Sequence, residues 1–408
     1  MKINSINKIF ITCSFFGYEL IATITSSVGV LSTPYAVAMR ALVVLAAIVV
    51  IIRYSSVNCQ RLKYDNLAFG FSLFWILYLF RLLYSTTISS ELLVYSPSYY
   101  WVWAVGACLI PMSAIYLITI QKNHFSLIFN YSYSILTLSG ILAVLKGSGL
   151  EVDGNGELVE RGRLVLAALN PISMGQLGVT ILILSLWSSY YKFFQFSIVI
   201  KLLFLFNICI GSYLIVGSNS RGPLLSAIVC MAYMIIFSSP RFRFYILSIL
   251  AFFVILFPTF ALYVEDNYGF STYSRIVGEN QIESESTTNR LDRYYSVWND
   301  FIVNPLFGSG LEEPIFGGYP HNIFVEAFLN TGIIGGTLLI ILMFNVLINS
   351  VKIYKNYTEY SWVSLIFVQY ITSAQFSGAI YSSTHLWISI ALILLIRNLS
   401  KKSTSLLK

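Results

Sequence analysis

The segment FSIVIKLLFLFNICIGSYLIVG, residues 196–217, is an apolar run with one charged residue, Lys201. The short turn SNSR, residues 218–221, separates it from a second apolar run, GPLLSAIVCMAYMIIF, residues 222–237. A helix of about 20 apolar residues crosses a lipid bilayer. The segment therefore predicts two membrane-spanning helices that are joined by a tight turn.

Apolar runs of this kind recur along the whole chain. Of the 408 residues, 57% are hydrophobic and 11% are charged, which is typical of a polytopic membrane protein. We predict an all-α fold with about 12 transmembrane helices in a single integral membrane domain, residues 1–408. The first span is expected to remain uncleaved, because Glu19 interrupts it and no A-x-A site follows. The expected spans are 9–31, 34–52, 66–85, 97–120, 125–146, 168–190, 196–217, 222–237, 244–264, 332–350, 360–380 and 384–397.

The net charge and the cysteines exclude several other classes. The net charge is +7, but most basic residues lie in short segments between apolar runs, where membrane topology accounts for them. No nucleic-acid partner is expected. The five cysteines lie in or beside apolar runs without metal-ligand or CxxC spacing. No metal site, cofactor or disulfide framework is therefore predicted.

The positions of lysine and arginine predict the orientation in the membrane, because cytoplasmic loops are enriched in both. Counted from a cytoplasmic N-terminus, the even-numbered loops and the tail contain Arg53, Arg61, Lys63, Lys122, Lys192, Arg241, Arg243, Lys352, Lys355, Lys401, Lys402 and Lys408. Both termini are therefore expected in the cytoplasm. The outer side receives the turn at 218–221, a loop around 147–167 and one large loop at 265–331.

The outer segments nevertheless contain several arginines. A guanidinium binds phosphate or carboxylate oxygens with two hydrogen bonds and stays charged at any working pH, so these residues indicate an anion-binding site. Surface charges balanced by carboxylates remain the alternative for those in the loops. Arg221 is the most position-specific, because it lies in a tight turn before Gly222 and Pro223. The outer arginines are Arg161, Arg163, Arg221, Arg275, Arg290 and Arg293. Single charges within spans, such as Arg81, are expected to pair inside the bundle or reach the interface.

The large outer loop contains a predicted amphipathic helix. In LDRYYSVWNDFIV, residues 291–303, apolar and aromatic residues recur at helical spacing, so the helix is expected to lie against the membrane domain. It is expected to begin near Thr288 or Asn289, either of which can cap it, and to end before Pro305. Arg290 would then lie in its first turn, where the backbone N–H groups also favour an anion.

Three segments resemble the bacterial O-antigen polymerase and O-antigen ligase superfamily. They are SNSRGP at 218–223, TTNRLDRYYSVWNDFIVNPLFGSG at 287–310 and PHNIFVEAFLNTGIIGG at 320–336. In the third, His321 and Asn322 are followed by nine residues and then by Gly332 and Gly335, which fits the family pattern of His, then Asn, Ser or Gln, nine residues and Gly-x-x-Gly. The ordered set agrees with the family's topology of about twelve spans and one large outer loop.

The resemblance implies an activity and roles for individual residues. Enzymes of this superfamily join sugars carried on undecaprenyl pyrophosphate to an acceptor hydroxyl at the outer face of the inner membrane. Arg221 and Arg290 would hold the pyrophosphate, and His321 would take the proton from the hydroxyl as general base. Arg161, Arg163, Arg293, Asn322 and Glu326 are further candidates for contact with substrate. Asn322 is alternatively a helix cap, and Glu326 is alternatively the partner of an arginine.

Several alternatives remain open from the sequence. The polar outer loop and the YPHN form favour a polymerase over a ligase that transfers the glycan to lipid A core. A transporter or flippase for a lipid-linked sugar would also have many spans and buried arginines, but no internal repeat is found. The chain contains no Asp-x-Asp and no cluster of His, Cys and carboxylates, so we favour a metal-independent mechanism. The expected partners are membrane lipids and an undecaprenyl-pyrophosphate-linked oligosaccharide, and the resemblance also implies a regulator of chain length.

Overall fold

The computed structural model describes residues 3–30, 32–63, 65–121, 124–152, 158–191, 197–268 and 282–405. The chain divides into two compact units, which are considered separately below. Unit 1 comprises Met1–Arg40, Gln121–Gln281 and Tyr354–Thr372, and unit 2 comprises Ala41–Ile120, Ile282–Ile353 and Ser373–Lys408. The expectation of a single domain over residues 1–408 stays a prediction.

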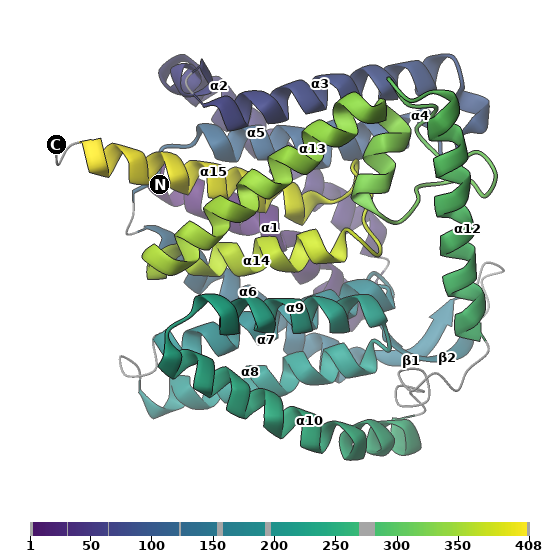
Figure 1. The fold of residues 1–408 in the computed structure, drawn as a ribbon. Coiled ribbons are helices and arrows are strands. Elements are labelled where there is room, and N and C mark those ends of the chain that lie inside the picture. Colours follow the sequence, from purple (N-terminus) through teal and green to yellow (C-terminus); the bar gives the residue numbers. More distant parts are fainter. Residues whose placement is uncertain are drawn as a thin grey trace. The chain divides into compact units, whose positions relative to one another are not determined.

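Long apolar helices dominate the described chain (Figure 1). Eight of the described helices are long and apolar enough to cross a membrane: Ile6–Val28, Pro34–Ser55, Asn66–Thr87, Pro97–Leu117, His124–Lys146, Pro171–Tyr191, Ile198–Gly217 and Ile323–Asn356. Two shorter apolar helices, Arg221–Phe237 and Thr384–Leu399, coincide with two further predicted spans. The predicted class, an all-α polytopic membrane protein, is confirmed.

Unit 1 is arranged around one buried helix. α7 (Pro171–Tyr191) is buried along most of its length, and it packs against α6 (His124–Lys146), α8 (Ile198–Gly217) and α9 (Arg221–Phe237). Inside the unit, the side-chain amide of Gln369 donates to the backbone and side-chain oxygens of Gln176, both at 2.9 Å. These bonds satisfy buried polar groups and tie α7 to α14 (Ser361–Ser373). The unit also contains α1 (Ile3–Val28), β1 (Ser148–Val152), β2 (Leu158–Val165), α10 (Pro240–Tyr268) and η4 (Thr358–Tyr360).

The two strands of unit 1 were not expected. β1 and β2 form an antiparallel hairpin within the segment that the sequence predicted as an outer loop around 147–167. The span expected at 168–190 follows it as α7, which begins at Pro171, and the side-chain oxygen of Asn170 accepts the N–H of Ser173 at 2.8 Å. A helix start is a favoured place for proline, whose missing N–H has no intrahelical partner there.

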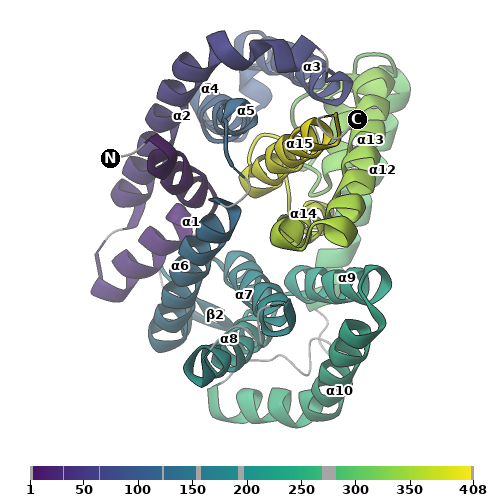
Figure 2. The same cartoon turned by 90° about the vertical axis from the view of Figure 1, so that its left-hand side faces the viewer.

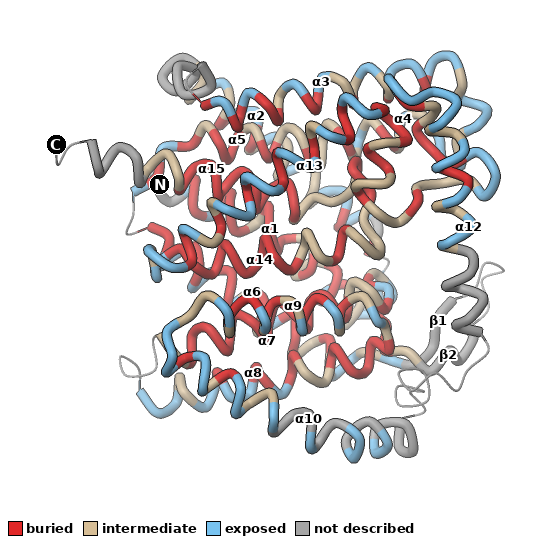
Figure 3. Tube along the Cα trace, in the orientation of Figure 1, coloured by how far each residue is buried: buried red, intermediate tan, exposed pale blue. Residues whose placement is uncertain are grey.

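Unit 2 is arranged around α15 (Thr384–Ser405). The side chains from Leu386 to Ile396 are almost completely buried (Figure 3), and α15 lies between α5 (Ile110–Leu117) and α13 (Ile323–Asn356) in the view of Figure 2. The unit also contains η1 (Ser90–Leu92), α4 (Pro97–Trp101), η2 (Val102–Leu109), α12 (Ile282–Val303), α3 (Asn66–Thr87) and most of α2 (Ser32–Lys63). α12 runs across the direction of α3 in Figure 1.

The helix from α4 to α5 contains a π-helical stretch, η2. The N–H of Ile110 donates to the carbonyl of Val105, five residues earlier, and Pro111 follows at once. Proline has no N–H to donate and its ring clashes with the carbonyl four residues before it in a regular α-helix. The wider turn accommodates this proline within a membrane-spanning segment.

One face of α3 consists of apolar side chains that the rest of the protein leaves uncovered. These side chains recur every three or four residues, as expected for a single face of a helix, and their exposed fractions range from 41% to 68%. Such a stripe is stable where lipid rather than water is the solvent. The residues are Phe69, Leu73, Ile76, Phe80 and Leu83.

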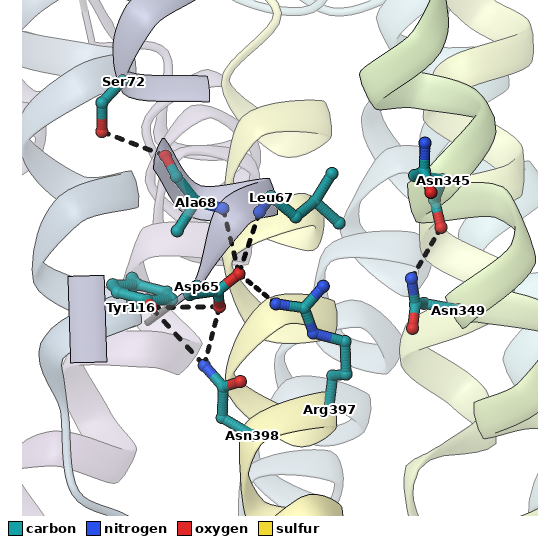
Figure 4. Close-up of polar contacts among 9 residues, drawn as sticks. All are labelled: Asp65, Leu67, Ala68, Ser72, Tyr116, Asn345, Asn349, Arg397 and Asn398. Carbon is teal, nitrogen blue, oxygen red and sulfur yellow. Dashed lines mark hydrogen bonds and ion pairs between the residues drawn. The ribbon is translucent and has the colours of Figure 1, made fainter. Parts of the chain in front are cut away.

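A polar cluster holds the N-terminal end of α3 in place (Figure 4). The Oδ1 of Asp65 caps α3 by accepting the N–H groups of Leu67 and Ala68, both at 3.1 Å. The same carboxylate forms an ion pair with Arg397 of α15 and accepts from Asn398 at 3.0 Å. The Asp65 and Arg397 side chains are only 4% and 16% exposed, so this pair is largely buried.

We expect Arg397→Met to lower the free energy of unfolding by about 3–5 kcal/mol, because it leaves the Asp65 carboxylate buried without its cation. The double variant Asp65→Asn/Arg397→Met should recover most of the loss, since asparagine retains the cap and carries no charge. The measurement is thermal unfolding in detergent of both single variants and the double variant. Additive losses in the double variant would contradict a buried ion pair.

Three predicted boundaries differ from the structure. The span expected at 360–380 is α14, which ends at Ser373 and is followed by turns to Ser383. The span expected from residue 332 belongs to α13, which begins at Ile323, and its backbone departs from helical geometry at Gly332 (φ 63°, ψ −161°). The outer helix expected near Thr288 is α12, which begins at Ile282.

Candidate functional site

The candidate site in unit 2 lies on α12 and on the irregular segment 304–322 that connects it to α13. Of the outer loop predicted at 265–331, residues 269–281, which include Arg275, lie outside the described part of the chain. Because α12 begins at Ile282, Arg290 lies eight residues into the helix. The expectation that Arg290 occupies the first turn, beside free N–H groups, is therefore wrong. The capping residues expected from the sequence are preceded by two further turns of helix.

His321 occupies a special backbone position directly before α13. Its φ of 61° lies in the left-handed region, which residues other than glycine adopt rarely. Its imidazole packs edge-on against the ring of Tyr319, with 4.5 Å between the ring centroids. The next residue, Asn322, caps α13, because its side-chain oxygen accepts the N–H groups of Phe324 and Val325 at 3.0 and 3.2 Å. The left-handed residue thus turns the chain sharply into the capped helix.

Two guanidinium groups act on the imidazole of His321. Burial, together with the positive charges of Arg290 and Arg293, lowers the pKa of His321 to about 4. The position of Arg293 is fixed, because its Nη1 donates to the carbonyl of Gly317 at 2.6 Å and its guanidinium lies 5.5 Å from the ring centroid of Phe316. Within the described residues, neither arginine forms an ion pair with an Asp or Glu. The cluster therefore combines a neutral imidazole with two positive charges that favour an anion.

Glu326 lies inside the fold, in the first turn of α13. Its side chain is 0% exposed, and its Oε2 accepts the N–H of Ile380 at 2.9 Å. Burial and the Glu326 carboxylate raise the pKa of Tyr319 to about 12, which keeps this phenol protonated at neutral pH. Glu326 therefore supports the loop before α15. Among the described residues there is no group of three or more His, Cys, Asp or Glu that could hold a metal ion.

Two adjacent glutamates, which the sequence did not single out, hold the loop in shape. Glu313 accepts the hydroxyl of Ser296 in α12 and the N–H groups of Ile315 and Phe316. Glu312 accepts the hydroxyl of Tyr100 and, at 2.7 Å, the N–H of Val94. Both side chains are buried. The sequence signal that could have identified them is two neighbouring carboxyls in a loop with few basic residues. If such carboxylates are buried, they require hydrogen-bond donors from the protein.

Arg81 of α3 anchors the start of the same segment, a role that was not predicted for it. Its Nε donates to the carbonyl of Asn330 at 2.7 Å, and its Nη2 donates to those of Phe307 and Gly308 at 2.6 and 2.7 Å. The carbonyl of Asn330 is available because α13 is interrupted at Gly332. A cavity of about 600 Å³ lies beside this anchor, and none of the site residues predicted from the sequence lines it.

The remaining arginine candidates belong to unit 1. Arg221 is exposed and opens α9, directly after the predicted tight turn, in which Asn219 has a φ of 48°. The turn approaches α7 closely, since a Cβ on Gly175 would lie 2.6 Å from the hydroxyl oxygen of Ser218. Arg163 and Arg161 lie on β2, and the side chain of Arg161 is outside the described part. Arg290, Arg293, His321, Asn322 and Glu326 all belong to unit 2.

Fold and site define a polytopic membrane protein with a basic, histidine-containing site on a loop between apolar helices. Residues 204–340 match the family model described as O-antigen ligase, and this third of the chain contains all three segments quoted above. The match confirms the resemblance to the superfamily of O-antigen polymerases and ligases, which are enzymes. No curated protein sequence matches the chain closely.

Proposed function

We propose that this protein is an O-antigen polymerase, a glycosyltransferase that joins oligosaccharide repeat units carried on undecaprenyl pyrophosphate. The observation that carries the proposal is the cluster of His321, Arg290 and Arg293, in which the positive charges of two guanidiniums act on a half-buried imidazole and keep it neutral. The family match supports the class of reaction. The distribution of basic residues supports a site at the periplasmic face of the bacterial inner membrane, with both termini in the cytoplasm.

The reaction breaks the bond between the anomeric carbon of one repeat unit and its pyrophosphate oxygen. A hydroxyl of a second lipid-linked unit attacks that carbon, its proton passes to His321, and undecaprenyl pyrophosphate departs with the electron pair. The guanidiniums of Arg290 and Arg293 stabilise the negative charge that develops on the departing group. No metal ion is required in this scheme. The family resemblance assigns a pyrophosphate contact to Arg221 as well.

The test is incubation of the purified protein with undecaprenyl-pyrophosphate-linked repeat units in EDTA, without lipid A core. A ladder of products that each differ by one repeat unit is expected from wild type. Transfer that appears only after lipid A core is added would identify a ligase, the activity in the description of the matched family. Absence of transfer under both conditions, with folded protein and the cognate sugar, would favour a transporter of lipid-linked sugar.

The pH dependence of the reaction should report the environment of His321. Because burial and two arginines lower its pKa to about 4, the imidazole of the free enzyme loses its ability to accept a proton only as the pH falls toward 4. As the pH is lowered, we therefore expect kcat/KM to fall near pH 4 rather than near 6.5. The fall of kcat should occur at a higher pH than that of kcat/KM, because bound pyrophosphate offsets the guanidinium charges.

Variants of the charged neighbours test this assignment. Arg293→Gln removes a positive charge that opposes the imidazolium form, so it should move the acid limb of kcat/KM to higher pH. Asp292→Asn changes an exposed neighbouring charge and serves as the control. Two results would argue against His321 as the titrating base. One is a fall of kcat/KM near pH 6.5 in wild type, and the other is a fall whose pH does not change in Arg293→Gln.

A further inference from the structure

A continuous run of aromatic rings leads from an exposed surface to His321 within unit 2. Tyr95 and Tyr99 stack with 4.5 Å between their ring centroids. The ring of Tyr99 meets that of Tyr381 edge-on, with 6.2 Å between the centroids. The centroids of Tyr381 and Tyr319 are 6.1 Å apart, and those of Tyr319 and His321 are 4.5 Å apart. The rings come from three segments that are distant in sequence: the start of α4, the loop before α13 and the loop before α15.

The outer end of this run is held rigidly although it is exposed. Tyr95 is 47% exposed, and one face of its ring is backed by Tyr99. Its backbone N–H donates to the hydroxyl of Tyr100 at 3.2 Å. That hydroxyl in turn donates to the buried carboxylate of Glu312, which also accepts the N–H of Val94. The segment that carries Tyr95 is thus bound to the same loop that leads to His321.

A fixed tyrosine ring with an open face suits the apolar C–H face of a pyranose. Stacking buries that face without ordering a flexible side chain, and the phenol hydroxyl can bond to a sugar hydroxyl. Tyrosines at a membrane surface also serve as interfacial anchors. An anchor, however, needs neither a stacked partner nor a connection to the catalytic loop. The contacts through Glu312 and the ring run to His321 therefore favour a sugar-binding role.

We propose that Tyr95 and Tyr99 form a subsite that holds a pyranose ring of the acceptor oligosaccharide. The inference rests on the proposed function, because it assumes that His321 meets an acceptor hydroxyl. Since Tyr381 and Tyr319 lie between the stacked pair and His321, the bound sugar is a neighbour of the reacting one. The subsite therefore contributes to acceptor affinity and to selection of the repeat unit, and it takes no part in bond breaking.

Steady-state kinetics with lipid-linked acceptor in detergent test the subsite. Tyr95→Ala and Tyr99→Ala should each raise KM for the acceptor by roughly 3–10-fold, with kcat within about twofold of wild type, and Tyr95→Trp should restore the affinity. Tyr131→Ala is the matched control, because Tyr131 is also exposed, at 44%, and lies in unit 1 on α6. Thermal unfolding of each variant verifies that the fold is intact.

A direct binding measurement separates the two proposals. The probe is the repeat-unit oligosaccharide released from its lipid by mild acid, titrated into wild type and Tyr95→Ala. Wild type that extends chains while neither tyrosine variant changes KM or binding would overturn the subsite and leave the polymerase intact. If wild type extends no chains but binds the oligosaccharide, and Tyr95→Ala weakens that binding, the proposed polymerase activity would be overturned and the proposed sugar-binding subsite would stand.

Discussion

Replacement of His321 by asparagine is expected to lower the rate of chain extension by roughly 10²–10⁴-fold, the usual contribution of a general base. Asparagine is the informative substitution because it tolerates the left-handed backbone that His321 adopts. It therefore removes the imidazole and keeps the turn into α13. The product ladder and single-turnover rates measure the loss, and KM for the lipid-linked donor should change little.

His321→Ala extends the comparison, because alanine removes the imidazole and also strains the backbone at φ 61°. Both variants should show this large loss of rate if the imidazole accepts the proton. Retention of activity by asparagine but not by alanine would show that only the turn matters. His124→Asn is the control histidine variant, since His124 lies at the start of α6 in unit 1.

The second large effect is expected at Gly332. A Cβ there would lie 2.3 Å from the carbonyl carbon and oxygen of Leu306, and the φ of 63° is unfavourable for any residue with a side chain. The N–H of Ile333 donates to the carbonyl of Pro305 at 2.8 Å, so the loop backbone is bound at this break. Gly332→Ala should lower the free energy of unfolding by about 2–5 kcal/mol, from strain and overlap together, and abolish transfer by displacing the loop.

The variant Gly318→Ala separates backbone strain from steric overlap. Gly318 also has a positive φ, 73°, but nothing lies within 4 Å of the position of its Cβ. Only the conformational cost of about 1–2 kcal/mol should therefore appear. The measurement is thermal unfolding of both variants beside their transfer rates. Equal losses in the two variants would contradict the close approach of the loop to α13.

The membrane helices could be predicted from the sequence because lipid as a solvent imposes a simple rule. Each spanning segment must satisfy its backbone internally and present apolar side chains over about 20 residues. The turn before Arg221 was predicted for a related reason, since SNSR is too short and too polar for anything else. The sequence left two interpretations of Asn322 open: its hydrogen bonds show the helix cap, and its contact with substrate stays a prediction.

The start of α13 could not be predicted, because its first turns contain polar residues whose partners are remote in sequence. Glu326 accepts from Ile380, and the amide of Asn330 donates to Leu311. Without those contacts, residues 323–331 look too polar for a buried helix. The helical interruption at Gly332 then coincides with the place where hydropathy alone begins the span.

Arg81 and Glu312, which both escaped prediction, share one property: each forms hydrogen bonds with backbone groups of a distant segment. Arg81 contacts carbonyls more than 220 positions further along the chain, and Glu312 contacts Val94. Such pairs leave no local pattern, because a backbone carbonyl or N–H is present at every position. Arg290, His321 and Asn322 were singled out because side chains rather than backbone groups define their motif.

The anchor at Arg81 has a consequence for how far the sequence of this loop can vary. Among the described residues, the guanidinium bonds to peptide oxygens alone, at Phe307, Gly308, Ser309 and Asn330. Exchange of the side chains at Phe307 and Ser309 therefore leaves every acceptor of the anchor in place. A surface loop secured in this way can acquire new side chains over evolution while its attachment to α3 is preserved.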